Sequence, residues 1–405
     1  MSPKRAYLLT ISSWYLAYGM QSVVFAWLVT LVLRELPERV GFAQMMLGLP
    51  TMLLILLAGV LADRIGPRRQ AIWAQLMAAL CPWALIVAIA LGHFSYVILI
   101  GYALAMGAAT AFVIPARDGM LNVVAGQNVQ RMVVLSSLCQ FGFQIIGFTL
   151  AGFADQMGAV TILVLQSVFL LVGVFAFAPL KVNFESGTRA HRTAASTSVI
   201  QELRMGASTV LTHPIMRTVV LQNVAMGLFF AGSFIVGFPL VVREVFAGSS
   251  GDLALLNALN SAGLVLTILL LLRLGPIRRA GRGLLLAQGL GSLVLLSAGL
   301  ADQELLFVVL VFFWGICGGL ALPMSRTLMQ QLAPADQRAR VMSFYSLSFL
   351  GAAPLGALLV GYLASLYGPQ QAIVTAALAM LLVLIMVALV SPMWNDKLSE
   401  VAETA

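Results

Sequence analysis

Twelve long apolar segments constrain this chain more than any other feature of its sequence. A helix needs about 20 apolar residues to cross the hydrocarbon core of a bilayer, and each segment is close to that length. The sequence lacks the strand-like alternation at ten-residue spacing that is typical of outer-membrane barrels. We therefore predict an all-α membrane protein, with spans near residues 7–33, 41–62, 71–92, 95–115, 132–154, 159–180, 215–242, 253–274, 283–301, 304–324, 341–366 and 370–391.

The composition excludes most other classes of protein. Hydrophobic residues make up 61% of the chain, whereas only 23 basic and 15 acidic side chains are present. Ordinary soluble domains are about 25% charged, and so few charges could not cover a soluble fold of this size. A soluble enzyme, a disordered chain and a disulfide scaffold are therefore excluded. The three cysteines, Cys81, Cys139 and Cys317, lie in different spans without metal-ligand spacing and are interpreted as small apolar residues.

The basic residues predict the orientation of the chain in the membrane. With the amino terminus inside, all but three of the 23 basic residues lie on the cytoplasmic side, the exceptions being Arg34, Arg39 and Arg243. This distribution satisfies the positive-inside rule. We expect no cleavable signal peptide, because Lys4 and Arg5 hold the start of the first span on the cytoplasmic side. Both termini are thus expected in the cytoplasm, and the net charge of +8 does not require a nucleic-acid partner.

The chain repeats itself once, at about half its length. Four pairs of matching residues or motifs, given below, lie at nearly the same offset, which is unlikely to be coincidence. We therefore predict two six-helix halves in the same orientation, related by an axis along the membrane normal. We also expect the two matching prolines to end spans four and ten. A shift of 209 residues carries Arg64 onto Arg273, Arg34-Glu35 onto Arg243-Glu244 and Gly152 onto Gly361, and a shift of 208 carries Pro115 onto Pro323.

One long polar stretch separates the two halves. Within it, the segment from Ser198 to Met205 has helical spacing and is expected to lie on the inner leaflet as an amphipathic helix. His213 closes the stretch and is interpreted as a solvated loop residue. The predicted division is a six-helix half at 1–180, a cytoplasmic central loop at 181–213, a second half at 214–392 and a cytoplasmic tail at 393–405.

The loop after span two carries the sequence Gly59-Val60-Leu61-Ala62-Asp63-Arg64-Ile65-Gly66-Pro67-Arg68-Arg69. In a protein of two parallel six-span halves with a basic central loop, this stretch resembles the signature G-x-L-A-D-R-x-G-x-R-R of the major facilitator superfamily. Pro115-Ala116-Arg117 and the segment from Gln201 to Pro214 are similar to the bacterial branch that contains the enterobactin exporter and related secretion-type transporters. Phe148 departs from the Gly-Pro pair of antiporter-type relatives.

The resemblance implies a cytoplasmic latch between the halves that is closed when the cavity faces outward. Asp63 is expected near the start of span eleven, where the helix dipole favours a carboxylate, and Arg117 matches its latch partner. In the second half Leu272 replaces the symmetry-related Asp and Ile277 interrupts the basic run, so a charged latch is one-sided. Alternatively, Arg64, Arg68 and Arg69 are topology determinants alone. The predicted gating residues are Gly59, Asp63, Arg64, Gly66, Arg68, Arg69, Arg117 and Asp336, the last as a helix cap.

The same resemblance places the substrate near the bilayer midplane, between the halves and lined by spans one, four, seven and ten. Uncharged amides and aromatic side chains predict a cavity for a mid-sized amphipathic or aromatic molecule. Amides inside a membrane also hold helices together, so part of this set is expected to be structural. The candidates are Trp14, Tyr18, Gln21, Phe25, Gln140, Gln144, Gln222, Asn223, Asn257, Asn260, Trp314 and Tyr345.

These features favour a secondary transporter of the bacterial inner membrane that exports a siderophore-like or drug-like molecule by alternating access. No Asp, Glu, Lys or Arg lies in the middle third of a predicted span, so coupling to protons would use edge carboxylates such as Asp63, Glu35 or Asp118. An importer or lipid translocator on the same fold, or a sensor that transports nothing, stays open.

The sequence does not favour an enzyme. It lacks a nucleotide-binding loop, a Cys/His metal cluster and a Ser/His/Asp group, so we expect no cofactor and no bound metal. The expected partners are a small-molecule substrate and the lipid bilayer, with protons as a possible coupling ion, and the expected state is a monomer.

Overall fold

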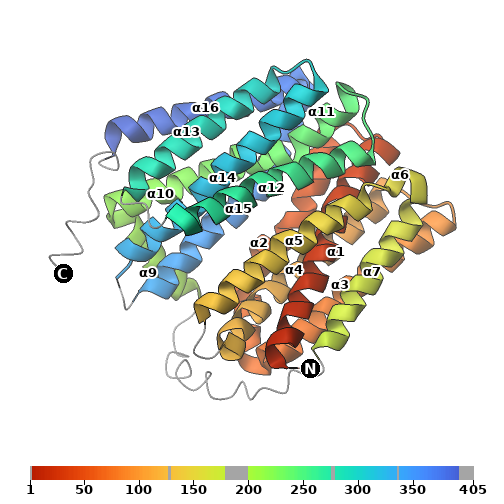
Figure 1. Cartoon of the computed structure of the whole chain (residues 1–405), viewed down its shortest axis with the longest axis horizontal. Coiled ribbons are helices and arrows are strands. Elements are labelled where there is room, and N and C mark those ends of the chain that lie inside the picture. The colour runs from red at the N-terminus through yellow and green to blue at the C-terminus, as the bar shows by residue number, and fades with distance from the viewer. Residues whose placement is uncertain (1, 126–128, 178–198, 275–278, 335–336, 392–405) are drawn as a thin grey trace. The chain divides into compact units, whose positions relative to one another are not determined.

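The computed structural model describes residues 2–125, 129–177, 199–274, 279–334 and 337–391 (Figure 1). Twelve of its helical stretches are long and apolar enough to cross a membrane, which confirms the predicted all-α fold with twelve spans. The helices are α1 (Pro3–Trp27), α2 (Pro37–Ile65), α3 (Pro67–Ala90), α4 (Tyr96–Ala125), α5 (Val129–Ala151), α6 (Ala154–Met157), α7 (Ala159–Ala176), α9 (Val199–Thr212), α10 (Pro214–Ala225), α11 (Phe238–Glu244), α12 (Ser250–Leu274), α13 (Ala280–Gly299), α14 (Glu304–Leu332), α15 (Arg338–Tyr367) and α16 (Pro369–Val390).

In the described part of the chain, three short π-helical segments interrupt this pattern. They are η1 (Leu28–Val32), which continues α1, and η3 (Met226–Ala231) and η4 (Ser233–Gly237), which lie between α10 and α11. They therefore occur in spans one and seven, the first span of each predicted half. A π-helical turn widens a helix locally and is frequent at functional sites.

The expectation that Pro115 and Pro323 end their spans is wrong. Pro115 lies inside α4, which continues to Ala125, and Pro323 lies inside α14, which continues to Leu332. Within a bilayer, neighbouring helices and local adjustments can compensate the hydrogen bond that a proline removes, so a helix tolerates it. Arg117 is thus a helical residue of α4 and lies about one helical turn before Leu121, where the apolar span ends.

The chain forms two compact units. The first comprises Met1–Glu35, Ala43–Thr197 and Ala247–Ala258, and the second comprises Leu36–Phe42, Ser198–Phe246 and Leu259–Ala405. The start of α12 therefore belongs to the first unit and its remainder to the second. The start of α2 belongs to the second unit and its remainder to the first.

Glycines bring two helices together in each unit. A methyl group built on Gly147 of α5 would lie 2.1 Å from the carbonyl oxygen of Leu16 in α1. In the second unit, a methyl group on Gly356 of α15 would lie 2.4 Å from the carbonyl oxygen of Gly227 in η3. Because a shift of 209 residues carries Gly147 onto Gly356, the same contact joins the first and fifth helices of both repeats. Small residues permit such close approach of membrane helices.

A second glycine contact repeats in the same way. A methyl group on Gly107 of α4 would lie 2.2 Å from the carbonyl oxygen of Leu47 in α2, and one on Gly315 of α14 would lie 2.1 Å from that of Asn260 in α12. Here the shift is 208 residues, as for the proline pair. The internal repeat read from the sequence is therefore also a repeat of helix packing within each unit.

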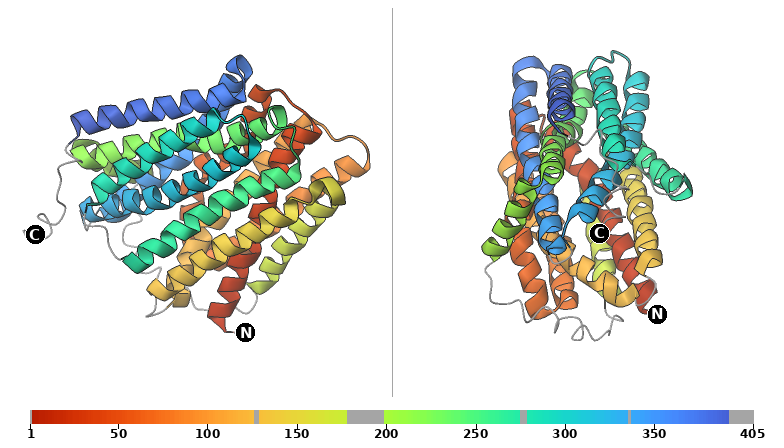
Figure 2. Two further views of the ribbon diagram at one scale, coloured as in Figure 1. Left: turned by 45° about the horizontal axis from the view of Figure 1, so that its top comes forward. Right: turned by 90° about the vertical axis from the view of Figure 1, so that its left-hand side faces the viewer.

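The second unit contains two further packing arrangements. α13 packs against both α14 and α16, which can be followed in Figure 2. The amphipathic segment expected at 198–205 is a longer helix, α9, and it packs against α15 and α10. Its Val210 is buried, and Gly206 approaches the backbone of Arg340 at the start of α15. The linker helix therefore has a protein partner along its apolar face.

Candidate functional site

The first unit buries a cation between α1 and α4. Arg117 is only 8% exposed, its Nη2 donates to the hydroxyl of Tyr15 at 2.8 Å, and its guanidinium lies 4.6 Å from the centre of the Tyr15 ring. The Tyr7 hydroxyl donates to the backbone carbonyl of Arg117 at 3.2 Å. The predicted latch partner of Arg117 is Asp63, whose side chain lies outside the described part of the structure, so that pairing stays a prediction.

The other candidate residues of α1 divide into buried and exposed groups. Trp14, Gln21 and Phe25 are buried, and the Phe25 ring stacks on Tyr102 of α4. Tyr18 is 38% exposed and meets Tyr15 edge to face. The Gln21 Oε1 atom is buried without a hydrogen-bond partner. Most of the candidate cavity residues on α1 are therefore buried by packing, and Tyr18 is the accessible one.

Three amides of the first unit are half-buried. Gln140 and Gln144 lie on α5, and the backbone carbonyl of Gln144 contacts Gly19 of α1. The Asn257 amide donates to the carbonyl of Leu253, one turn earlier in α12. A bond to its own helix leaves Asn257 with no described role in joining helices.

In the second unit, two neighbouring amides of α10 have opposite environments. Asn223 donates to the carbonyl of Tyr345 at 2.9 Å and to the hydroxyl of Ser348 at 2.7 Å, so it joins α10 to α15. Gln222 is 0% exposed, and neither its Oε1 nor its Nε2 has a hydrogen-bond partner. Asn223 is thus a structural amide, whereas Gln222 has unused donors and acceptors inside the protein.

Tyr345 and Asn260 take part in packing between helices of the second unit. The Tyr345 hydroxyl donates to Ser325 of α14 at 3.0 Å. Asn260 is half-buried, and its backbone carbonyl receives the close approach of Gly315. Both residues are therefore placed at helix contacts, as amides and hydroxyls inside membranes often are.

An aromatic cluster surrounds Trp314 in the second unit. Its ring centre lies 5.6 Å from Phe230, 5.9 Å from Phe234 and 5.5 Å from Phe238, the first two being residues of the π-helical segments. Trp314 itself is half-buried. Aromatic pairs at such distances are attractive beyond the area they bury. Phe230 and Phe238 are buried, so only Trp314 and Phe234 are partly exposed in this cluster.

The signature loop after α2 is built around a turn at Gly66. Its φ of +87° suits glycine, and Pro67 begins α3 directly after it. Arg68 donates to the carbonyl of Phe177 at 3.1 Å, whereas Arg64 and Arg69 are exposed. A methyl group on Gly59 would meet no described atom within 4 Å, so no described helix approaches α2 closely at this glycine.

The start of span eleven differs in detail from the expectation. α15 begins at Arg338, and the residue at its N-cap position is Gln337, whose side chain does not cap the helix. Gln337 Oε1 instead accepts from the Thr209 hydroxyl of α9. Asp336, the expected cap, lies outside the described residues, as does Ile277, and the side chain of Leu272 is not described either.

The sequence reasoning missed a contact at the opposite end of the first unit. The Asp155 carboxylate in α6 accepts from the Trp27 indole N–H at 2.8 Å and from the backbone N–H of Ser250 at 2.6 Å. The Ser250 hydroxyl returns a bond to the Gly152 carbonyl at 2.9 Å. Partial burial raises the pKa of the Asp155 carboxyl, but the bonds from Ser250 and Trp27 outweigh it and leave the pKa below its ordinary value.

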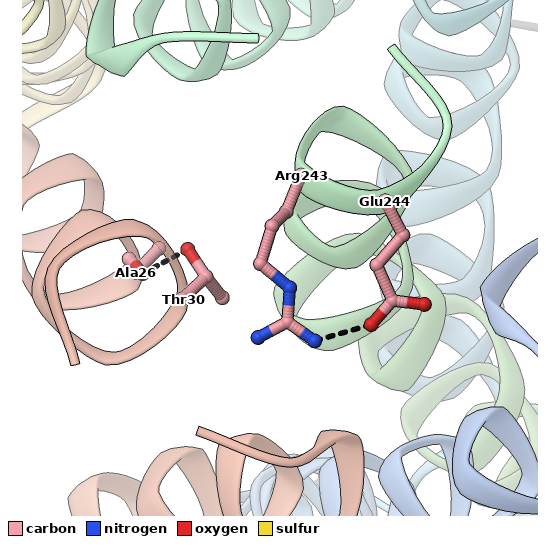
Figure 3. A network of polar contacts seen from close by, with 4 residues as sticks. All are labelled: Ala26, Thr30, Arg243 and Glu244. Atoms are coloured by element: carbon pink, nitrogen blue, oxygen red, sulfur yellow. Dashed lines mark hydrogen bonds and ion pairs between the residues drawn. The ribbon is translucent and has the colours of Figure 1, made fainter. Parts of the chain in front are cut away.

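A second contact between charged or polar groups lies at the end of span seven. Arg243 and Glu244, at the end of α11, form an ion pair between neighbouring side chains (Figure 3). The same figure shows the Thr30 hydroxyl, which donates to the carbonyl of Ala26 at 2.6 Å where α1 passes into η1. Among the described residues, no group of three or more His, Cys, Asp or Glu side chains could hold a metal ion.

The comparisons with known proteins agree with the superfamily resemblance. The sequence profile of a family described as transmembrane secretion effectors, MFS_3, matches residues 8–403. A crystal structure of the nucleoside transporter NupG is similar with a TM-score of 0.72 over 98% of this chain and 100% of that one, at 14% identity. A mutant of NupG gives 0.71 over 95% and 98%, at 12% identity. Identities this low show a shared fold. None of the curated proteins matches the chain by sequence.

Proposed function

Because the chain belongs to the transmembrane secretion effector family of the major facilitator superfamily, we propose that it is a secondary transporter of the bacterial inner membrane. It exports a mid-sized amphipathic organic molecule by alternating access, and both of its termini lie in the cytoplasm. The positive-inside distribution of basic residues supports this orientation.

The unpaired amide of Gln222 is the observation that carries this proposal. Both polar atoms of this fully buried side chain lack partners, and it lies one turn before the π-helical segment η3. Burial of an amide without hydrogen bonds costs free energy, so such a group needs an explanation. Transient hydrogen bonds to a transported molecule provide one. In span one, Gln21 also has an unpaired Oε1 and lies about two turns before η1.

The aromatic residues support an amphipathic substrate. Trp314 and Phe234 are half-buried aromatic residues that stack on each other, and Tyr18 offers an accessible ring on span one. Accessible aromatic rings together with unpaired amides suit a molecule with an apolar body and a few hydrogen-bonding groups.

The signature loop supports a gate at the cytoplasmic end. Arg68 already ties this loop to the end of α7 through the Phe177 carbonyl. We place the latch at Asp63, with the start of α15 and Arg117 as its partners, and the remaining basic residues of the loop at the lipid headgroups.

The test is transport into everted membrane vesicles. Vesicles with the wild-type protein are energised, and the accumulation of an anionic, a neutral and a cationic amphipathic dye is compared with that in vesicles without it. We expect accumulation of at least one dye. Gln222→Leu should reduce it severalfold, whereas Gln371→Leu, a change of an exposed amide on α16, should leave it unchanged.

Two results would contradict the proposal. One is the absence of accumulation of all three dyes in vesicles that contain the folded protein. The other is accumulation in right-side-out vesicles alone, which would identify uptake.

A further inference from the structure

Arg117 is a buried cation whose hydrogen-bonding capacity is not filled. Its Nη2 bonds to the Tyr15 hydroxyl, but its Nη1 is buried without a hydrogen-bond partner. Among the described residues, no carboxylate lies within ion-pair distance of the guanidinium. Arg117 lies within the apolar span of α4, whereas Arg64 and Arg69 are exposed to their surroundings.

This arrangement is expensive unless an anion completes it. Arginine stays protonated in proteins, so burial cannot be relieved by loss of its proton. A buried charge with an unused N–H group is costly, because no hydrogen bond compensates the loss of its hydration. An ionisable side chain within a membrane segment is for this reason a functional-site candidate whose partner must be sought.

Tyr15 supplies a second donor beside the guanidinium. Its hydroxyl oxygen accepts from Arg117, so its own hydrogen is available to another acceptor. The ring lies over the guanidinium and thus covers it, and the Tyr18 ring meets the Tyr15 ring edge to face. Since Tyr15 is half-buried and Tyr18 exposed, a rotation of the Tyr15 side chain would connect the cation to the accessible face of α1.

We propose that, when the latch to Asp63 is open, Arg117 and Tyr15 form a binding subsite for an oxyanion, such as a carboxylate, sulfonate or phosphate group, carried by an amphipathic molecule. The guanidinium Nη1 and the Tyr15 hydroxyl donate to the oxyanion, and the apolar body of the molecule lies against Tyr18. The inference rests on the proposed transport function and narrows its substrate to organic anions. Charge-assisted hydrogen bonds from arginine to such groups are among the stronger ones in proteins.

The test is a binding measurement on the purified full-length protein in a neutral detergent. The probes are 1-pyrenebutyrate and 1-pyrenebutanol, which share an aromatic body and differ in the carboxylate. Energy transfer from the tryptophans to pyrene reports binding. We expect the wild-type protein to bind pyrenebutyrate at least tenfold more tightly, which corresponds to about 1.4 kcal/mol.

Three variants assign this preference to the subsite. Arg117→Gln should abolish it, and Tyr15→Phe, which keeps the ring and the cation, should weaken it severalfold. Arg217→Gln removes an exposed arginine of α10 and should leave the preference intact. If Arg117→Gln does not fold, Tyr15→Phe still decides. Equal binding of the two probes by the wild-type protein, or an unchanged preference in either subsite variant, would overturn the inference.

A competition experiment identifies where the oxyanion comes from. If phosphatidylglycerol displaces pyrenebutyrate from the wild-type protein and a soluble organic anion such as anilinonaphthalenesulfonate does not, the ligand is a lipid headgroup. If only the soluble anion displaces the probe, the ligand is a soluble molecule. Failure of both competitors to displace the probe would count against the subsite. Charge-selective binding without flux in vesicles would support this inference and refute the transport function. Flux in vesicles without charge-selective binding would support the transport function and refute this inference.

Discussion

Removal of the Asp155 carboxylate should release the start of α12 from the end of α5 and α6. The carboxylate accepts from Ser250 N–H, which is one of the backbone donors that a helix start leaves unpaired, and from the Trp27 indole. A side chain that caps a helix start contributes about 0.5–2 kcal/mol, and a hydrogen bond to a charged group about 1.5–3 kcal/mol when it is buried. Because Asp155 is exposed, we take the low end for both bonds, about 2 kcal/mol together.

Hydrogen–deuterium exchange of the first amides of α12 measures this release. Asp155→Ala should raise the opening equilibrium about 30-fold, since every 1.4 kcal/mol is a factor of ten. Asp155→Asn keeps an acceptor and loses only the charge, so an increase of about fivefold is expected for a loss of about 1 kcal/mol. The control is Asp302→Asn, an exposed acid that makes no hydrogen bond to the described residues. Equal exchange in the wild type and Asp155→Ala would refute the reasoning.

The pH dependence of the same exchange has a defined sign. The pKa of Asp155 is lowered in the folded protein, so the ionised carboxylate stabilises the contact above its unfolded value of about 3.9. This contribution should be lost as the pH falls through the lower, folded pKa, and Asp155→Asn should lack that step. Trp27→Phe combined with Asp155→Asn should lose less than the sum of the single effects, because the two side chains share one bond.

The helix contacts give two further predictions. Gly147→Ala should lower the thermal midpoint in detergent by several degrees, because its methyl group would lie 2.1 Å from a backbone oxygen, whereas Gly142→Ala in the same helix meets no described atom within 4 Å and should be neutral or stabilising. An equal effect of both changes would contradict the close contact. Asn223→Leu should cost about 0.6–1.7 kcal/mol, the range for hydrogen bonds between membrane helices, and an unchanged midpoint would show that its bonds to α15 contribute nothing.

Hydropathy predicted the spans well because a bilayer imposes both length and apolarity on every crossing helix. It failed at Pro115 and Pro323, where rules for helices in water predicted ends but both helices continue. The repeat was visible in Gly152 and Gly361, since a residue without a side chain is favoured where two helices approach most closely. The π-helical segments were not predictable, because no periodicity of side chains marks a single widened turn.

The candidate site was predictable in residue type but not in environment. Asn223 and Gln222 are adjacent amides in the sequence, yet the first donates two hydrogen bonds and the second has no partner. The difference depends on which face of α10 packs against α15, and the sequence alone does not show this face. The contact of Asp155 was missed because this residue lies in the short helix α6 without a motif, and its partners Trp27 and Ser250 are distant in sequence.

Distances between spin labels at the two ends of the protein test alternating access most directly. In a background with Cys81, Cys139 and Cys317 replaced by serine, one label pair is placed at Lys4 and Arg279 and another at Gln156 and Asp302, so that each pair joins the two units at one predicted side of the membrane. We expect two distances for each pair, and pyrenebutyrate should shift their populations in opposite directions at the two ends. A single distance at both ends, unchanged by the probe, would contradict a transporter whose halves open alternately to either side.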